Sequence, residues 1–151
     1  MTQTKQYCTF HVADMFLGIA VEQVQEVLRF HPLTRVPLAA PSISGLINLR
    51  GQIVTAIDLR RRFELPPQDG DRPPMNVVIR ADDGVVSLLV DAIDDVLEVS
   101  VDDFENPPTT LRGPAQTLVE GAYKLTDRLL LVLNSQEAVN ACGPDHSLAS
   151  R

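Results

Sequence analysis

The sequence has few of the residues from which catalytic and metal sites are built. It contains three histidines and two cysteines in 151 residues, and His11, His31 and His146 have no short spacing to one another or to a cysteine. Metal sites in proteins need such clusters. The chain also lacks a phosphate-binding loop, a dinucleotide fingerprint and a Gly-x-Ser-x-Gly motif. We therefore expect no enzyme activity, no metal ion and no cofactor.

Long apolar runs and paired cysteines are also missing. The longest uncharged run, 36–49, is 14 residues long and includes two prolines, so it is too short and too broken to cross a bilayer. The N-terminus has no apolar signal segment. Cys8 and Cys142 lie near opposite ends and fit no disulfide framework. These absences predict a reduced, cytoplasmic protein without membrane insertion.

Positive charge is scarce. Lysine and arginine total 13 against 20 aspartates and glutamates, which gives a net charge of -7. An acidic chain without a basic tail is a poor ligand for a phosphate backbone, so we expect no nucleic-acid partner. The one basic run is Arg60, Arg61 and Arg62. We interpret it as the solvated face of a short helix.

Strand patterns dominate the apolar part of the sequence. Hydrophobic residues make up 44% of the chain, enough for a real core. We expect helices at 21–28, at 58–63 and from about Ser135, where Asn134 and Glu137 have capping-box spacing. The expected strands are 7–13, 16–20, 46–50, 53–57, 76–81, 85–90, 118–125 and 128–133.

The segment 45–59 reads as two apolar strands folded back around Arg50-Gly51-Gln52. Gly51 can take the positive φ that a tight hairpin needs. An arginine beside an apolar run needs a partner, and the best candidate is Glu26. We expect a partly buried ion pair that fixes the helix-like segment against the hairpin. Such a pair, with nothing catalytic near it, favours a binding module.

An internal repeat organises these pieces. Residues 7–28 align without gaps onto 76–97, an offset of 69, and 45–58 resembles 121–134. This order predicts two similar, intertwined β lobes, with approximate halves 7–63 and 76–139. The proline-rich connection 64–75 cannot hold a central strand. The tail 141–151 is small and polar, and we expect it to be flexible.

Two apolar surfaces are candidates for partner contact. Val24, Val27 and Leu28 recur with helical spacing and form an apolar stripe. The strand around Val86 is apolar on both faces, so it is buried on both sides, against the other lobe or against a partner. Val24 and Val86 fall on repeat-related elements, and we expect one of them in each lobe.

A set of short motifs resembles the CheW family of bacterial chemotaxis coupling proteins. The likeness covers roughly 7–139 and implies a single CheW-like domain over 1–151. It also implies a mainly β fold of two five-stranded, SH3-like β-barrel lobes packed on a shared apolar seam, with few short helices. The motifs are Val24-x-Glu26-Val27, Val36-Pro37, Gly45-Leu-Ile-Asn-Leu-Arg50-Gly51, Ile57-Asp58-Leu59 and Leu89-Val90-Asp91.

The resemblance also implies a function. Members are non-enzymatic scaffolds that join the cytoplasmic tips of chemoreceptors to the CheW-like regulatory domain of the histidine kinase CheA, in membrane-associated arrays. No kinase or phospho-acceptor domain is present, so the chain resembles the free-standing adaptor, and we expect a monomer when it is free. Matching receptor-binding positions in the groove between lobes are Val24, Glu26, Gly45, Arg50 and Val86. Kinase contacts at apolar lobe ends cannot be assigned to residues.

Three features depart from the family pattern. Ser87 stands where glycine is common and narrows the expected groove, Arg60–Arg62 is more basic than required, and 106–116 diverges. An alternative function is a small-molecule-binding β-barrel regulatory protein with the seam as its pocket. That reading needs convergent polar groups, whereas Glu26 and Arg50 more simply neutralise each other.

Overall fold

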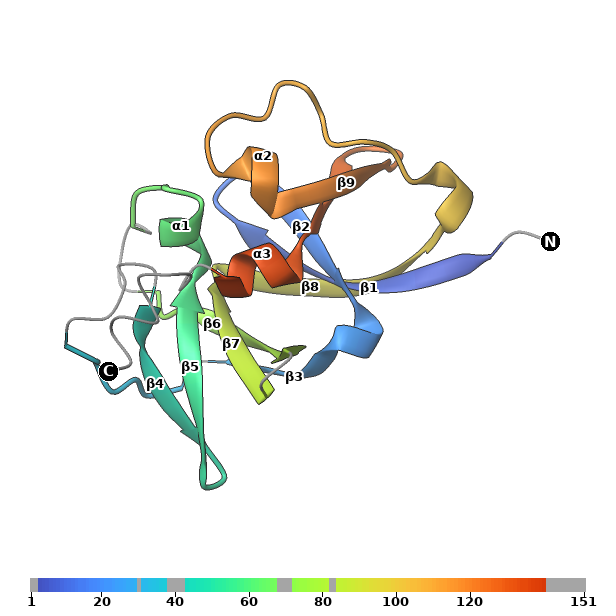
Figure 1. The fold of residues 1–151 in the computed structure, drawn as a ribbon. Helices are drawn as coiled ribbons and strands as arrows, with labels where there is room; N and C mark the ends of the chain where they lie inside the picture. Colours follow the sequence, from blue (N-terminus) through green and yellow to red (C-terminus); the bar gives the residue numbers. More distant parts are fainter. Residues whose placement is uncertain (1–2, 30, 38–42, 68–71, 82–83, 141–151) are drawn as a thin grey trace.

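Two five-stranded sheets account for most of the structure (Figure 1). The computed structural model describes residues 3–29, 31–37, 43–67, 72–81 and 84–140. The mainly β fold with few short helices is confirmed. The predicted tail 141–151, with Cys142 and His146, lies outside the described residues, as do 68–71 of the predicted connection.

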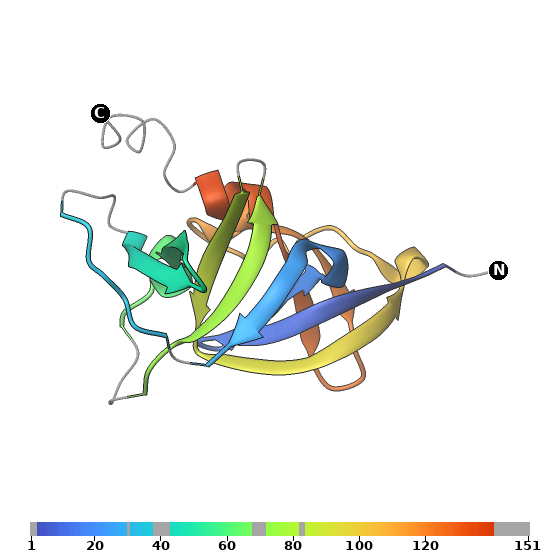
Figure 2. The same cartoon turned by 90° about the horizontal axis from the view of Figure 1, so that it is seen from below.

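Each sheet forms one lobe and takes strands from both halves of the sequence (Figures 1 and 2). The first lobe has the order β8 (Ala92–Ser100), β1 (Thr4–Val12), β2 (Met15–Ala20), β10 (Leu129–Leu133) and β9 (Val119–Lys124). The second lobe has the order β3 (Val24–Leu28), β6 (Met75–Ala81), β7 (Gly84–Val90), β5 (Gln52–Asp58) and β4 (Ile43–Leu49).

The internal repeat is visible as a reciprocal exchange of strands. The β1–β2 hairpin sends the next strand, β3, to the second lobe, and the β6–β7 hairpin sends β8 to the first. Val24 pairs with Ile79 and Ile93 pairs with Phe10, so the 69-residue offset relates both members of each pair. The parallel pairs Thr55 with Val86 and Leu131 with Leu17 also correspond, because the same offset relates Leu17 to Val86 and the alignment of 45–58 with 121–134 relates Thr55 to Leu131. The two lobes are therefore built alike.

Two of the predicted helices are confirmed by their caps. In α1 (Leu59–Arg62) the Asp58 side chain accepts hydrogen bonds from the N–H groups of Arg60 and Arg61. In α3 (Ser135–Val139) the Asn134 side chain accepts one from the Glu137 N–H. Such caps satisfy the free donors of a first helical turn. A third helix, α2 (Ala115–Leu118), was not expected.

The predicted helix at 21–28 is wrong. A 3₁₀ turn, η1 (Val21–Gln23), leads into strand β3. Along β3 the side chains alternate, with Gln25 and Val27 exposed and the others half-buried. The spacing of Val24, Val27 and Leu28 therefore imitated a helical stripe, although pairing with β6 makes the segment a strand.

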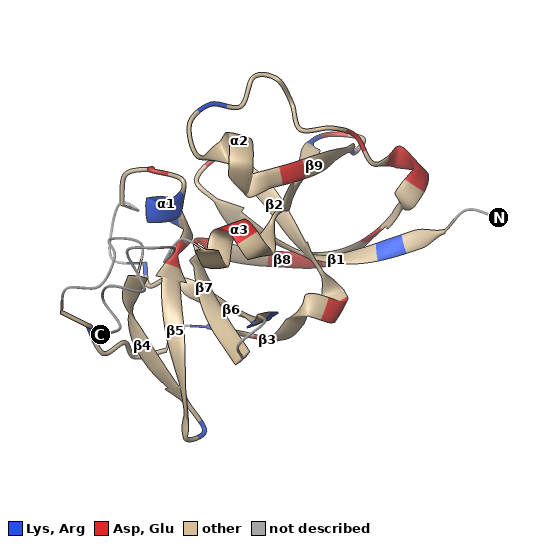
Figure 3. Cartoon of the chain, viewed as in Figure 1, with Lys and Arg blue, Asp and Glu red and all other residues tan. Residues whose placement is uncertain are grey.

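Figure 3 shows α1 in blue, the colour of Lys and Arg. The prediction that this basic run is solvated is wrong for Arg60 and Arg62. The Arg60 side chain is 17% exposed and donates to both carboxylate oxygens of Asp91, at 2.8 and 2.7 Å. Arg62 donates to the Glu137 carbonyl at 2.8 Å. These contacts tie α1 to the corner between β7 and β8 and to α3.

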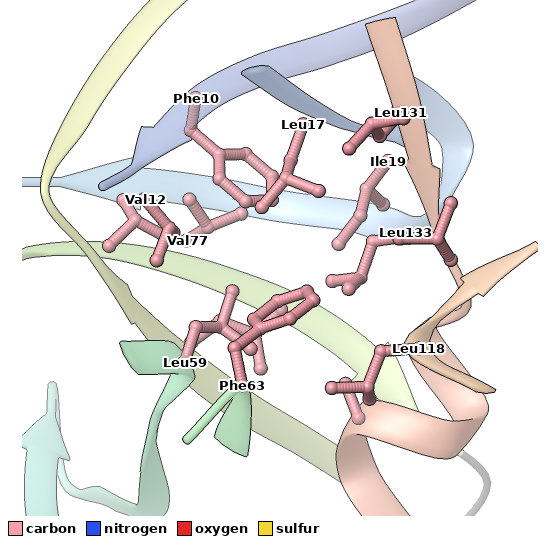
Figure 4. Packing of buried hydrophobic residues seen from close by; sticks show 14 of the residues in the cluster. Phe10, Val12, Leu17, Ile19, Leu59, Phe63, Val77, Leu118, Leu131 and Leu133 are labelled. Carbon is pink, nitrogen blue, oxygen red and sulfur yellow. The ribbon is translucent and has the colours of Figure 1, made fainter. Parts of the chain in front are cut away.

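Three apolar clusters form the core, and the largest of them joins the two lobes. The largest draws buried side chains from both sheets and all three α-helices, and Figure 4 shows Leu17 and Ile19 of the first lobe facing Leu59 and Phe63. A smaller cluster lies within each lobe, around Tyr123 in the first and Ile47 in the second. The shared apolar seam is thus confirmed, and each large side chain buried in it contributes about 2 kcal/mol.

No helix among the described residues is long and apolar enough to span a membrane.

Candidate protein-docking site

The five predicted docking residues all lie in the second lobe. Val24 and Glu26 are on β3, Gly45 is on β4, Arg50 is in the β4–β5 turn and Val86 is on β7. The expectation that Val24 and Val86 come from different lobes is wrong, because β3 crosses over to join the sheet that contains β7. Strand pairing places them in one row, which runs through Leu46, Thr55, Val86, Ile79 and Val24.

Val86 presents little surface. It is 8% exposed and belongs to the seam cluster, and Val24 is half-buried against the same cluster. Both valines therefore support the surface by packing in the core. A charge introduced at Val86 would be buried in the apolar seam.

Glu26 and Arg50 form an ion pair at the surface. The Arg50 guanidinium donates to both carboxylate oxygens of Glu26, and the Arg50 side chain is 69% exposed against 23% for Glu26. The hydrogen bonds from Arg50 lower the pKa of Glu26, and those to Glu26 raise the pKa of Arg50. Because the arginine lies mostly in solvent, the pair is screened and adds little to stability. Both charges remain within reach of a partner.

The hairpin that carries Arg50 is shaped by its own turn. Arg50 and Gly51 have φ angles of 51° and 90°, so Gly51 takes the positive φ that the sequence predicts. The Asn48 side chain accepts a hydrogen bond from the Gly51 N–H at 2.8 Å. This turn ends the long β4–β5 arm that projects from the second lobe (Figure 1).

A second contact joins the hairpin to the chain that follows β3. The His31 ring donates through Nε2 to the Asn48 carbonyl at 2.8 Å. Sequence reasoning gave His31 no role, because the contact depends on folding and not on spacing. With Glu26–Arg50, it fastens the hairpin to the β3 side of the lobe.

Gly45 is a close-packed position. It is buried with φ +155°, and a Cβ added there would lie 2.4 Å from the Thr34 carbonyl oxygen. Thr34 forms a two-hydrogen-bond bridge with Leu46, so the segment after β3 crosses directly over this glycine. In the first lobe Glu105 bridges Ala122 in the same manner, and the Phe104 ring covers Gly121. Gly45 therefore lets the crossing segment approach and has no side chain to offer a partner.

Ser87 lies inside the second lobe and lines no surface. It is fully buried, and its hydroxyl donates to the Asn76 Oδ1 at 2.8 Å. The expectation that Ser87 narrows a surface groove is therefore wrong.

The alternative of a ligand pocket in the seam is not supported. Buried side chains occupy the seam (Figure 4), and a cavity of about 450 Å³ lies instead in the first lobe. None of the five predicted residues lines it; its walls are residues 97–100 and 103, with 123–128 of the β9–β10 hairpin. In the part of the chain that the structure describes, no three His, Cys, Asp or Glu side chains group to hold a metal ion.

Comparison with known proteins identifies the fold and the family. A family model described as a CheW-like domain matches residues 6–142. The chain belongs to the CheW family. It is 31% identical to the chemotaxis protein CheW of Bacillus subtilis over 131 residues, which cover 87% of this chain and 84% of the relative. The CheW protein of Helicobacter pylori is 26% identical over 132 residues, 87% of this chain and 79% of the relative.

A solved CheW structure has the same architecture. The scaffolding protein TtCheW from Thermoanaerobacter tengcongensis superposes with a TM-score of 0.81 at 27% identity, covering 90% of this chain and 92% of that one. The CheW-like motifs of this chain include residues that hold the fold. Asp58 caps α1, and Arg60, two residues later, pairs with Asp91.

Proposed function

We propose that this protein is a non-enzymatic adaptor that couples chemoreceptors to the histidine kinase CheA in bacterial chemotaxis. Membership of the CheW family over residues 6–142 supports this function, and one solved relative is described as a scaffolding protein. The observation that carries the proposal is the solvent-exposed Glu26–Arg50 pair, which lies at the lobe edge without any catalytic group beside it. The protein works in the cytoplasm at membrane-bound receptor arrays, and it is a monomer when free.

The receptor tip docks along the edge formed by β3 and the β4–β5 hairpin. Glu26 and Arg50 offer charges to it, and Val24 offers a half-buried apolar contact. Gly45 and Val86 do not contact the receptor tip. Gly45 lets the Thr34 segment cross over it, and Val86 packs in the seam. A helical hairpin fits such an edge, because a helix presents apolar and charged side chains along one face. The kinase docks elsewhere, through its CheW-like regulatory domain.

The coupling role is tested by reconstitution. Receptor-containing membranes, CheA and ATP are combined with and without this protein, and the initial rate of CheA autophosphorylation is measured. We expect the rate to rise when the protein is present and to fall back with Arg50→Glu. Equal rates with and without the protein, at saturating concentrations of all components, would exclude coupling.

A further inference from the structure

The two exchanged strands are held differently from the other eight. β3 and β8 are the strands among the described residues that contain no fully buried side chain. Each is the outermost strand of its sheet and pairs on one side only. Burial of an apolar face is what normally fixes strand register. The apolar side chains of β3 and β8 that pack against the core clusters are only half-buried, so a second kind of contact has more to add in these strands than in the others.

Buried polar side chains provide that contact. Thr9, Asn76 and Ser87 are the buried polar residues of the described chain. Thr9 on β1 donates its hydroxyl to the Asp95 carbonyl of β8. Asn76 on β6 donates its side-chain amide to the Arg29 carbonyl at 3.0 Å, directly after β3. Each exchanged strand is therefore tied by the strand against which it pairs.

Ser87 sets the direction of the Asn76 tie. Its hydroxyl donates to the Asn76 Oδ1 at 2.8 Å, so the amide nitrogen of Asn76 faces the Arg29 carbonyl. Without that bond the Asn76 Oδ1 has no donor, and the orientation of the amide depends on the Arg29 carbonyl alone. Ser87 thus acts on β3 through Asn76.

The fold does not itself require a polar pair at this place. Asn76 and Ser87 correspond through the repeat to Tyr7 and Gly18 of the first lobe, where Asn76–Leu89 pairing is matched by Tyr7–Ala20. Tyr7 packs in the apolar cluster of the first lobe and places its hydroxyl 3.4 Å from that of Tyr123. The first lobe therefore fills this place with an aromatic side chain whose hydroxyl lies near another hydroxyl of its own core, whereas the polar pair in the second lobe contacts the chain next to an exchanged strand.

We propose that the Ser87–Asn76 pair positions β3, and through β3 places Glu26 and Val24 for docking. The inference rests on the proposed function for its docking part alone. Asn76 lies opposite Leu28 in the strand register, two residues after Glu26. With the tie at Arg29 lost, β3 is free to separate from β6 at this end, and the Glu26 carboxylate moves away from Arg50.

Three variants test the positioning role. Ser87→Ala leaves the Asn76 Oδ1 without its donor, whereas Asn76→Leu with Ser87→Ala removes the whole pair and takes a donor only from the carbonyl of the exposed Arg29. Thr9→Val is the matched control, because it cuts the corresponding tie of β8. Hydrogen exchange of the free protein is measured for the amides of β3 and β8, together with the thermal melt and the affinity for a receptor-tip fragment.

We expect the double variant to melt at or above the temperature of Ser87→Ala, because it no longer buries the Asn76 Oδ1 without a donor. Its β3 amides should nevertheless exchange about tenfold faster than in the parent, the effect of one lost buried hydrogen bond. Its affinity for the receptor fragment should fall by a similar factor. Thr9→Val should speed exchange in β8 alone and keep the parental affinity.

Parental protection of β3 in the double variant would overturn the proposal. Faster exchange in β3 with undiminished affinity would overturn the link to docking. If the parent protein itself fails to bind the fragment, the proposed function is wrong, and exchange in the free protein still decides whether the pair holds β3.

Discussion

Asp91 is the residue at which three parts of the chain meet. Its carboxylate accepts hydrogen bonds from Arg60 of α1 and from the Ala13 N–H in the β1–β2 turn. Burial raises the pKa of Asp91, but the hydrogen bonds from Arg60 and Ala13 together outweigh it, so the net pKa is lowered. Asp91 is therefore charged in the native state and stabilises it.

This pKa shift predicts an acid-sensitive stability. The contribution of Asp91 is fully present above the unfolded pKa of about 4 and is lost as pH falls through the lower folded value. Asp91→Asn should lower the free energy of unfolding at pH 7 by about 3 kcal/mol, because Arg60 loses its buried partner. Urea unfolding of both proteins from pH 7 to pH 2.5 should show this gap shrinking below about pH 4. A gap that stays constant with pH would contradict the assignment.

A larger residue at Gly121 should clash with a side chain, and removing that side chain should relieve the clash. A Cβ there would lie 1.9 Å from the Phe104 Cζ, so Gly121→Ala should destabilise by about 2 kcal/mol, as overpacking does. Adding Phe104→Ala removes the clashing ring. Gly121→Ala should therefore cost less stability in the Phe104→Ala protein than in the parent. Gly45→Ala is the contrast, because its neighbour is the Thr34 backbone and no side-chain deletion relieves it. Urea unfolding of the four variants checks this. Strictly additive effects of Gly121→Ala and Phe104→Ala would exclude the contact.

At the level of elements, β3 shows where sequence reasoning fails. Its five residues offer apolar side chains at spacings that suit either a helix or a strand, and its partner β6 lies some fifty residues away. A local pattern cannot reveal such a distant partner. The repeat did not resolve this, because 24–28 aligns with 93–97, which is not among the expected strands, although both segments are strands in the structure. Hairpins and caps were predictable, since their signals are contained within a few neighbouring residues.

At the β3 edge and the β4–β5 hairpin, we expect variants that weaken receptor binding without lowering the stability of the fold. Because the Arg50 side chain is largely exposed, Arg50→Glu should change the melting temperature little and weaken receptor-fragment binding by at least about tenfold. Glu26→Arg with Arg50→Glu restores an ion pair but reverses both charges, so binding should stay weak. Thermal melts and calorimetric titrations measure the two effects. A large loss of stability in Arg50→Glu that the double variant repairs would instead assign the pair a structural role.

For the whole molecule, the sequence predicts two similar lobes but not the pairing of their third strands. Val24 and Ile93 occupy equivalent positions, so β3 suits β1 and β6 alike by pattern. The spacing of apolar residues therefore does not choose between the two partners. The proposed docking residues come from the family resemblance, whereas the burial of Val86 and the backbone contact at Gly45 appear only in three dimensions.

The exchange of strands predicts that neither half folds alone. In residues 1–67, β3 lacks its one partner β6 and β1 lacks β8, whereas in 72–151 β8 lacks its one partner β1 and β6 lacks β3. Expressed separately, each half should give an unfolded far-ultraviolet circular dichroism spectrum, and an equimolar mixture should recover the β spectrum of the parent. A folded spectrum from either half by itself would contradict the interlocked arrangement.

The order of the strands along the chain also sets the order in which a ribosome delivers them. Every strand of the second lobe lies between residues 24 and 90, whereas the first lobe needs 4–20 together with 92–133. The last strand of the second lobe ends at residue 90 and that of the first lobe at residue 133, so about 40 residues, or about 2–8 s of synthesis, separate the two. During that time the β1–β2 hairpin has been synthesised without the strands that flank it. The part of the chain that is made first is thus the last to be enclosed in its sheet.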